Sequence, residues 1–453
     1  MRKELTMERK LTKTNYLKYI LAIALPISIQ SLFQSSLSVI DQIMVGSLGE
    51  INIASIGLAG KFPTVFFFTV GSISVGASIL ISQYRGKNDK TSISKAFMLC
   101  FKWGLILTGI FFGLSYFFSN SLMSLFTNDP SVTLVGGNYL KIITLGFLPG
   151  FVTTMMSALL RNTGKAKLPM FASIGAVILN TLLNYLLIFG NFGFPELGVK
   201  GAAIATTIAR LIEFSIVLIF FIKHQLKDEY KINLLAKSDS VLMKTAFFVT
   251  LPIFLSELAW SLGEAVYGII YGHIGTNETA AMTLIGPVII LSIGLFAGVS
   301  QAASILVGNQ LGKSDYDMGV FLGHKSIKIG LIGTIIIGAL VIIFSSIYSN
   351  IYSVEASTKT TTSALLIMFA LVLWIKVSNM ILGGILKSGG KTKYVFLMDL
   401  LGTWVIGIPL GVISAFVFDL NIAWVYLLIS FEEFVRLIIG YRIFKSRIWI
   451  QTL

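Results

Sequence analysis

Residues 77–89 read ASILISQYRGKND, and residues 303–315 read ASILVGNQLGKSD. The two stretches share the tetrapeptide ASIL, a Gly-Lys pair and an aspartate at the same spacing, so that each number in the first becomes its counterpart on adding 226 (77 + 226 = 303). The same offset aligns further landmarks: Pro26 with Pro252, Gly46 with Gly272, Leu160 with Leu386 and Arg210 with Arg436. One register that holds from residue 26 to residue 210 predicts a chain made of two similar halves.

Both halves are dominated by long apolar runs. Hydrophobic residues are 55% of the 453 residues and charged residues only 12%, against about 25% charged in a typical soluble domain. Runs such as 16–45, 51–83 and 96–118 reach the roughly 20 residues that a helix needs to cross the hydrocarbon core. Alternating segments of about ten residues, typical of a membrane β-barrel, do not occur. We therefore predict an all-α polytopic membrane protein with about twelve spans.

The basic residues lie on alternate sides of these predicted spans. Lys and Arg gather before the first span and after every second one, whereas the opposite loops hold only Lys200 and Lys359. The positive-inside rule then predicts that the basic side and both termini are cytoplasmic. Because the charges are dispersed over many short loops, the net charge of +14 indicates membrane topology and the lipid bilayer as partner, and no nucleic acid.

The repeat and the topology together predict the domain organisation. Each half has six spans, an even number, so the halves share one orientation and are related by a pseudo-twofold axis along the membrane normal. We expect an N-terminal lobe at residues 1–222, a cytoplasmic linker at 223–244 and a C-terminal lobe at 245–453. A substrate cleft is expected between the lobes, near the membrane midplane.

Polar residues inside the spans of the first half are the first candidate site. A charge there costs roughly 2.5–3.5 kcal/mol on insertion scales, so it needs a partner or a function. Asp41 shares a helix face with Gln34, and Asn180 and Asn184 lie one turn apart on the predicted fifth span. A carboxylate and two amide carbonyls form an oxygen set that suits a hard cation such as Na⁺. Two alternatives remain: Asp41 takes up a proton, or it only locks helix packing.

In the second half, Glu257 and Glu264 are seven residues apart on the predicted seventh span, with Trp260 between them. Lys376 and Asn379 lie in the tenth span. Pairing of Lys376 with either glutamate would lower the cost of burying both, and a purely structural ion pair is the alternative. These five residues, together with Gln34, are the predicted substrate-cleft residues.

Other charged neighbours have a local explanation. Glu213 follows Arg210 by three residues, and Glu432 and Glu433 precede Arg436 by four and three. Spacings of three and four place such side chains side by side on a helix. We interpret them as structural pairs near the cytoplasmic ends of the spans.

No enzymatic motif is found. A phosphate-binding loop of the GxxxxGK[ST] type is absent, so the chain cannot itself hydrolyse ATP by that route. His224, His273 and His324 fall in or near loops and form no metal-ligand cluster, and no nucleophile–base pair occurs. We expect neither catalysis nor a cofactor.

The chain resembles the multidrug and toxic compound extrusion (MATE) family over about residues 16–445. The motifs that carry the resemblance are VIDQIMVG at 39–46, QYRGK at 83–87, LRNTGK at 160–165, GVKGAAIAT at 198–206, LKSGGK at 386–391, and the pairs Leu25-Pro26, Leu251-Pro252, Gly286-Pro287 and Ile408-Pro409.

The resemblance implies export of organic, often cationic, drugs in exchange for Na⁺ or H⁺. Asp41, Asn180 and Asn184 match the family's ion-coupling positions, and Tyr139 and Thr206 fall near the same site. The seventh-span glutamate of many relatives aligns nearer to Trp260 than to Glu257. The resemblance therefore supports coupling through Asp41 better than a cation site in the second half of the kind proposed for some relatives. We expect a monomer in the cell membrane of a bacterium.

Flippases of lipid-linked oligosaccharides, from the same wider superfamily, are the competing class. Their central cavity is usually more cationic, to hold a pyrophosphate lipid. Here the acids Asp41, Glu257 and Glu264 are set against Lys61 and Lys376, which favours cationic substrates.

Overall fold

The computed structural model describes residues 12–46, 48, 50–227, 232–233, 239–352 and 354–451, and within them the side chains of 37–39 and 41–43, among a few others, are outside the description. Every regular element in these ranges is helical, with no strand, which confirms the predicted all-α class. The first half contains α2 (Tyr16–Gly46), α3 (Glu50–Ala59), α4 (Lys61–Gly86), α5 (Lys90–Phe117), α6 (Ser119–Ser124), α7 (Pro130–Thr144), α8 (Phe147–Asn162), α9 (Lys167–Phe189), η2 (Asn191–Gly193) and α10 (Gly198–Lys227). The second half contains α11 (Ser240–Ile274), α12 (Thr276–Gly312), α13 (Tyr316–Ile351), α14 (Ala356–Ser388), α15 (Lys393–Leu400), η3 (Leu401–Gly407), α16 (Ile408–Val412), η4 (Ile413–Val417), α17 (Ile422–Ile429) and α18 (Phe431–Ser446).

Most of these helices are long and apolar enough to cross a membrane. Within the described residues ten segments meet that requirement, and the pair α7–α8, bent by 44°, brings the number to eleven. The shorter helices α17 and α18 follow in the place of the predicted twelfth span, separated at Ser430. The expectation of about twelve spans is therefore confirmed.

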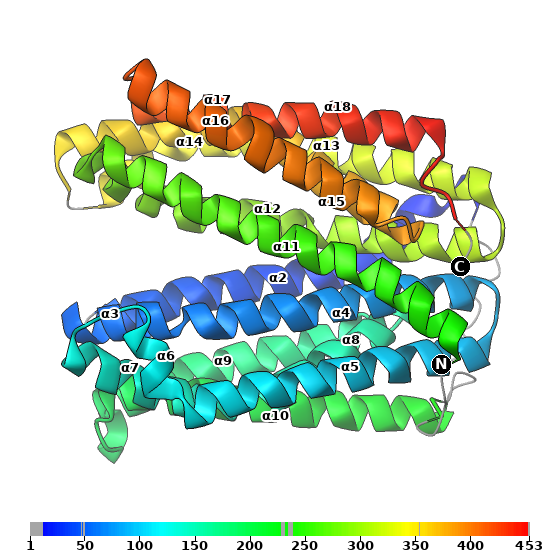
Figure 1. Ribbon diagram of the computed structural model, residues 1–453, viewed down its shortest axis with the longest axis horizontal. Coiled ribbons are helices and arrows are strands. Elements are labelled where there is room, and N and C mark those ends of the chain that lie inside the picture. The colour runs from blue at the N-terminus through cyan, green and yellow to red at the C-terminus, as the bar shows by residue number, and fades with distance from the viewer. Residues whose placement is uncertain are drawn as a thin grey trace. The chain divides into compact units, whose positions relative to one another are not determined.

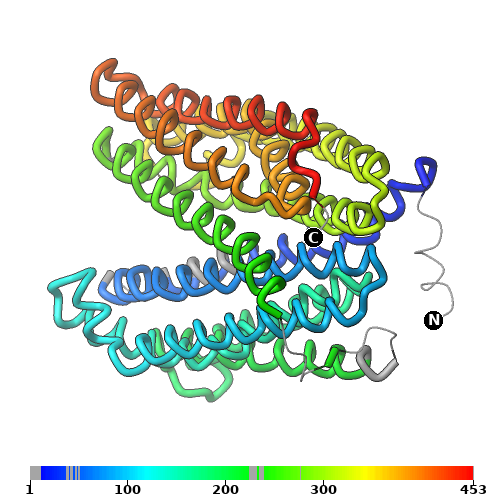
Figure 2. The backbone as a smooth tube through the Cα atoms, turned by 45° about the vertical axis from the view of Figure 1, so that its right-hand side comes forward, coloured from blue at the N-terminus to red at the C-terminus, as the bar shows by residue number. Residues whose placement is uncertain are grey.

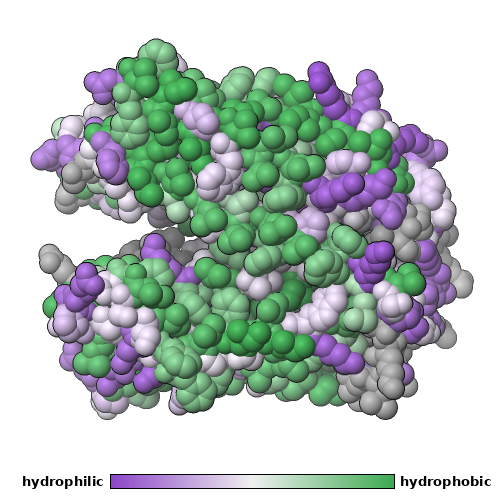
Figure 3. Space-filling model, viewed as in Figure 1, coloured by the Kyte–Doolittle hydropathy of each residue, from purple (hydrophilic) through white to green (hydrophobic). Residues whose placement is uncertain are grey.

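The apolar surface agrees with this. On α13, Ile335, Ile343 and Ile347 are 61%, 66% and 60% exposed, and their spacings of eight and four place them on one helix face. Hydrophobic side chains cover much of the helix surfaces in Figure 3, and hydrophilic ones gather mainly towards the helix ends. A soluble protein would not expose so broad an apolar surface.

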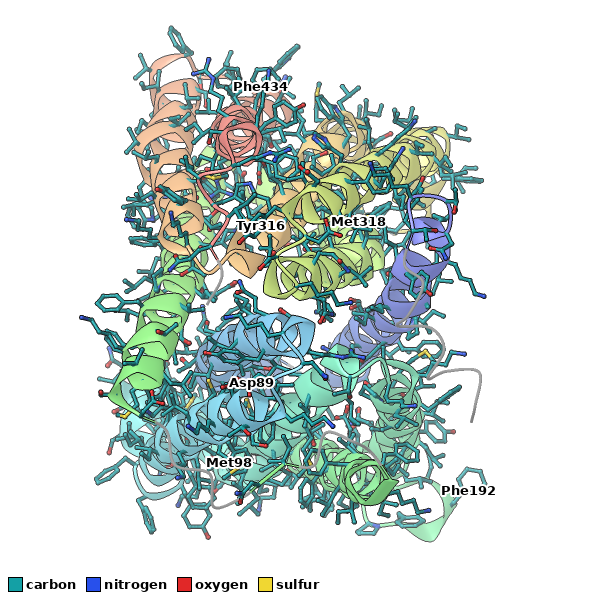
Figure 4. The ribbon with its side chains drawn as sticks, turned by 90° about the vertical axis from the view of Figure 1, so that its right-hand side faces the viewer. Asp89, Met98, Phe192, Tyr316, Met318 and Phe434 are labelled. Carbon is teal, nitrogen blue, oxygen red and sulfur yellow. The ribbon has the colours of Figure 1, made fainter. Side chains whose placement is uncertain are left out.

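The internal repeat extends to local geometry. Asp89 caps α5 and accepts a hydrogen bond from the backbone N–H three residues on, at 3.0 Å. Asp315 caps α13 in the same way, accepting from the N–H of Met318 at 3.1 Å (Figure 4 labels Asp89 and Met318). The residue before each cap, Asn88 or Ser314, has a positive φ of 59° or 60°. All four positions are related by the offset of 226, so the sequence repeat is also a repeat of structure.

The chain divides into two compact units. One, here called the C unit, consists of Met1–Ser31, Ser82–Asn88 and Leu251–Leu453. The other, the N unit, consists of Leu32–Ile81 and Asp89–Thr250. The helices α2 and α11 therefore contribute residues to both units, and the lobe boundaries expected from the sequence stay a prediction.

In the N unit, α10 packs against α7, α8 and α9. The packing of α9 on α10 is close at Gly201, where a Cβ atom would lie 2.3 Å from the carbonyl oxygen of Leu187. Small residues allow such close approach of membrane helices. Tyr139 of α7, Ile188 of α9 and Ala203 of α10 share one hydrophobic core. This packing brings the polar residues of α9 and α10 together.

In the C unit, α14 is central: it packs against α12, α13, α17 and α18, and α12, α13 and α14 run alongside each other in Figure 1. The eleventh span departs from the α-helix twice, in the π-helical segments η3 and η4. It nevertheless continues as one orange rod in Figure 2. Single π-helical turns often occur at functional sites.

Candidate functional site

The predicted coupling residues of the N unit that are described form one hydrogen-bonded group. Asn180 and Asn184, each 2% exposed, lie one turn apart on α9. The amide of Asn184 donates to Oδ1 of Asn180 at 3.1 Å, and the amide of Asn180 donates to Oγ1 of Thr206 on α10 at 3.3 Å. Three of the five predicted coupling residues are thus brought together.

Of the two remaining predicted coupling residues, only Tyr139 has a described side chain. Tyr139 is buried in the core that α7 shares with α9 and α10. The hydroxyl of Thr207, next to Thr206, donates to the carbonyl of Ile142 at 3.0 Å and ties α10 to α7. Asp41 lies in α2, but its side chain is outside the described residues, so its predicted role as a ligand stays a prediction.

Gln34 links α2 to α9 within the N unit. Its amide donates to Oγ of Ser173 at 3.0 Å, although the Gln34 side chain as a whole is exposed. The contact shows which face of α9 this part of α2 packs against.

The predicted substrate residues of the C unit fall into two groups. Trp260 and Glu264 are exposed, four residues apart on α11. Glu257, also on α11, has an ion pair with Lys387, with 3.8 Å between Nζ and Oε1. The expected pairing of Lys376 with Glu257 or Glu264 is wrong. The Lys376 ammonium instead contacts Oε1 of Glu433, at 3.4 Å.

Lys376 and Asn379 belong to a buried cluster around α18. The amide of Asn379 donates to Oε2 of Glu433 at 2.8 Å and to its carbonyl oxygen at 2.7 Å. Arg436 contacts Glu433 at 3.7 Å and Glu432 at 3.9 Å. These three α18 residues, Glu432, Glu433 and Arg436, are 5–8% exposed. We call this set, completed below, the C-unit cluster.

Further helices complete the C-unit cluster. Asp399 of α15 lies 3.9 Å from Arg436 and accepts a hydrogen bond from Ser256 of α11. The hydroxyl of Tyr267, also on α11, donates to Oε2 of Glu432 at 2.5 Å. Four helices thus contribute ionisable groups: α11, α14, α15 and α18.

Sequence reasoning missed this cluster. The local pairs at spacings of three and four are present, and their place near the cytoplasmic ends of the spans stays a prediction. Spacing along one helix could not show that Lys376, Asn379 and Asp399 of other helices meet these residues. Three ionisable residues within five positions of an apolar run were the signal.

The geometry defines a class: an all-α polytopic membrane protein, built from an internal repeat and carrying buried polar groups in each unit. The chain belongs to the MatE family, whose family model matches residues 26–186 and again 252–413. The starting points of the two matches, residues 26 and 252, have the same offset as the sequence repeat. This confirms the family resemblance.

Relatives of similar length match most of the chain. An uncharacterized transporter, YisQ, of Bacillus subtilis is 23% identical and covers 91% of this chain and 90% of its own. A probable multidrug resistance protein, NorM, of Agrobacterium fabrum is 24% identical over 89% of this chain and 88% of its own. A third, YoeA of Bacillus subtilis, named a probable multidrug resistance protein, is 26% identical over 92% and 91%.

Solved structures confirm the fold. A crystal structure of MATE in complex with MaL6 matches with a TM-score of 0.89 at 20% identity, over 96% of this chain and 98% of that one. A MOP superfamily transporter from Pyrococcus furiosus, reported with a binding pocket of reverse polarity, matches with a TM-score of 0.87 at 20% identity over 97% and 98%.

Proposed function

We propose that this chain is a secondary active exporter of organic cations, driven by the exchange of Na⁺ or H⁺. The observation that carries the proposal is the buried group of Asn180, Asn184 and Thr206, which holds two amides and a hydroxyl within an apolar helical unit. Relatives named as probable multidrug resistance proteins match nearly the whole chain, which supports drugs as the transported substrates.

The coupling ion is proposed to bind between Asp41 and this group. Gln34 reaches Ser173 of α9. Asp41 follows Gln34 by seven residues, nearly two helical turns, and Asn180 follows Ser173 by the same number. If the two helices run in the same direction, as the first and fifth spans should, Asp41 and Asn180 are at matching heights. Amide and hydroxyl oxygens, with Tyr139 nearby, suit Na⁺; the carboxylate alone suffices for H⁺.

The substrate contacts are proposed on α11. Trp260 is 41% exposed and shares a helix face with the exposed carboxylate of Glu264. An aromatic ring attracts a cation through its π face, and a nearby carboxylate pairs with a delocalised charge. Gln34 and Glu257 remain further candidates. Lys376 and Asn379 are engaged with Glu433, so they act on substrates only through that cluster.

The sequence pattern supports a proposal for the membrane, the topology and the oligomeric state. We propose that the protein acts as a monomer in a bacterial cell membrane, with both termini cytoplasmic and with residues 1–222 and 245–453 as the two transport lobes. Ion and drug must favour different conformations of these lobes, because a ligand shifts an equilibrium only through its different affinities for the two states.

Replacing the carboxylate tests the coupling role. Asp41→Asn keeps the size of the side chain but removes its charge and its titration. Gradient-driven ethidium efflux should fall to the level of cells without the protein, while the yield and melting temperature of the purified protein stay close to wild type. A variant that pumps ethidium at the normal rate would refute the proposal, and a lower melting temperature with residual pumping would indicate a packing role.

Substitution of the two asparagines distinguishes Na⁺ coupling from H⁺ coupling. If Na⁺ couples, Asn180→Ala and Asn184→Ala should each raise the Na⁺ concentration for half-maximal transport at least tenfold, since each removes an oxygen ligand. If H⁺ couples, they should shift the pH profile of transport and leave it insensitive to Na⁺. Thr181→Ala, on α9 beside them, is the matched control and should change neither.

A further inference from the structure

The C-unit cluster has more acids than bases. Asp399, Glu432 and Glu433 face Lys376 and Arg436 at 3.4–3.9 Å. With every group ionised, one negative charge is left over inside a membrane-spanning unit. Such a charge costs several kcal/mol unless it acquires a counter-charge.

The internal repeat relates this cluster to the coupling site of the N unit. With the offset of 226, Tyr267 is the repeat equivalent of Asp41, and Glu432 is the repeat equivalent of Thr206. The first half thus has an acid on its first span and a hydroxyl on its sixth, and the second half has the reverse. In the second half the pair is in contact, with 2.5 Å between the Tyr267 hydroxyl and Oε2 of Glu432.

We propose that Glu432 is the proton-binding carboxyl of a second site, in the C unit, which corresponds by internal repeat to the coupling site of the N unit. We infer proton binding by Glu432 from the geometry of the cluster alone. A part of this proton in transport rests on the function proposed above.

Glu432 is the acid with the weakest support for a negative charge. Glu433 has an ammonium, a guanidinium and an amide within 3.7 Å. Glu432 has one guanidinium at 3.9 Å and the Tyr267 hydroxyl. Asp399 has the same guanidinium at 3.9 Å and the Ser256 hydroxyl, but its side chain is 22% exposed against 6% for Glu432, so its charge is less desolvated. The Arg436 guanidinium also has other acceptors, which weakens its support for the Glu432 charge. Its Nη2 donates to Oγ1 of Thr403 at 2.5 Å and to the Asp399 carbonyl at 3.3 Å. An extra proton therefore belongs on Glu432.

The remaining charged and titratable groups leave this assignment in place. Glu264 of α11 interacts electrostatically with Lys376 and adds negative potential. Tyr426 of α17 lies under the Lys376 ammonium, 6.0 Å from Nζ to the ring centroid. Tyr271 of α11 interacts electrostatically with Glu432. Of these, only an acid or a tyrosinate can add charge, and added negative charge favours the proton further.

A metal ion is a poorer fit than a proton. The repeat equivalents of Asn180 and Asn184 are Ile406 and Leu410, so these positions supply no amide oxygens in the second half, and the cluster contains one amide side chain, Asn379, which donates to Glu433. Lys376 and Arg436 also contact the carboxylates, at 3.4–3.9 Å, and repel a second cation. A proton needs only one oxygen and no ligand shell.

The π-helical segment η3 makes room for the pair. A Cβ atom at Gly407 would lie 2.0 Å from the Tyr267 hydroxyl and 2.3 Å from Oε2 of Glu432. Gly402, in the same segment, leaves similar space beside Nε of Arg436, an atom that is buried without a hydrogen-bond partner among the described residues. A side chain at either glycine would therefore overlap the polar atoms of the cluster.

Infrared spectroscopy of the purified protein tests the site directly, through the carboxylic acid C=O stretch. The difference spectrum of wild type minus Glu432→Gln at neutral pH should contain one such band. Wild type minus Glu257→Gln, which changes an acid paired with Lys387 outside the cluster, should lack it and lose a carboxylate band instead. Identical carboxylic absorption in wild type and Glu432→Gln would overturn the proposal, as would loss of the band in Glu257→Gln.

Three further infrared measurements complete the test. Tyr267→Phe keeps every acid and removes only the hydroxyl, so it should shift the band to higher frequency; an unshifted band overturns the proposal even if Glu432→Gln fails to fold. Exchange of K⁺ for Na⁺ should leave the band unchanged, and its loss in Na⁺ would indicate a metal site. Asp41→Asn should keep the band while losing transport, which separates failure of this site from failure of the proposed function.

Discussion

At the scale of single residues, the two ion pairs of α14 differ in their surroundings. Lys376 lies in the middle of the helix, and its partner Glu433 has a side chain only 11% exposed. Lys387 lies in the last turn, and its partner Glu257 is 35% exposed at 3.8 Å. Removing one member of a buried pair leaves an uncompensated charge, whereas water replaces a lost partner near a helix end.

Matched substitutions should therefore have different effects. Lys376→Met is expected to cost about 3 kcal/mol, because it strips a counter-charge from buried Glu433. Lys387→Met should cost less than about 1 kcal/mol. Melting temperatures in one detergent compare them, and the double variant Lys376→Met/Glu433→Gln should recover part of the loss. Equal melting temperatures for the two single variants would contradict this account.

The residue scale is also where sequence reasoning was least complete. Asn180 and Asn184 could be paired correctly, because a spacing of four on one helix fixes their neighbourhood. The partner of Lys376 could not, since Glu433 belongs to a different helix, far along the chain, and helix packing decides which acid the lysine meets. Spacing within one helix predicts contacts within that helix only.

At the scale of elements, the eleventh span combines a regular course with irregular hydrogen bonding. The π-helical segments η3 and η4 flank α16. Gly402 and Gly407 of η3 face buried polar groups, and Gly263 of α11 leaves space for Thr403 of the same segment, whose Cγ2 would lie 2.2 Å from an added Cβ. The glycines thus allow η3 to approach the cluster closely.

Adding a methyl group at this contact tests its importance. Gly407→Ala should destabilise the protein by about 1–3 kcal/mol, as overpacking of a buried site usually does. Gly268→Ala, on α11 with no atom within 4 Å of an added Cβ, should be neutral or slightly stabilising, since alanine favours helix. Thermal unfolding of both purified variants provides the comparison. A Gly407→Ala variant as stable as Gly268→Ala would contradict the close packing.

The elements themselves could largely be predicted. Apolar run length gives the spans, because a helix of about 20 residues matches the bilayer. The π-helical turns could not be predicted, since they leave the hydropathy of residues 393–417 unchanged. The break at Ser430 was also missed, because the apolar run continues across it.

At the scale of the whole molecule, one offset relates sequence, family and local structure. The helix caps Asp89 and Asp315, the two matches of the family model and the landmarks of the sequence all follow it. The halves are nevertheless not chemically equal: the amides of α9 have apolar equivalents, and Asp41 has the equivalent Tyr267. The two halves therefore share one helical framework but differ in their buried polar residues.

The most direct test of the proposed function is ion-driven ethidium transport in everted membrane vesicles, with a Na⁺ gradient and a proton gradient imposed separately. In such vesicles an exporter carries ethidium into the lumen as the coupling ion leaves it. We predict accumulation of ethidium against its gradient when the lumen is rich in Na⁺ or is acidic, and none with equal ions on both sides or in Asp41→Asn. Absence of accumulation under both gradients, or accumulation without any gradient, would contradict the account.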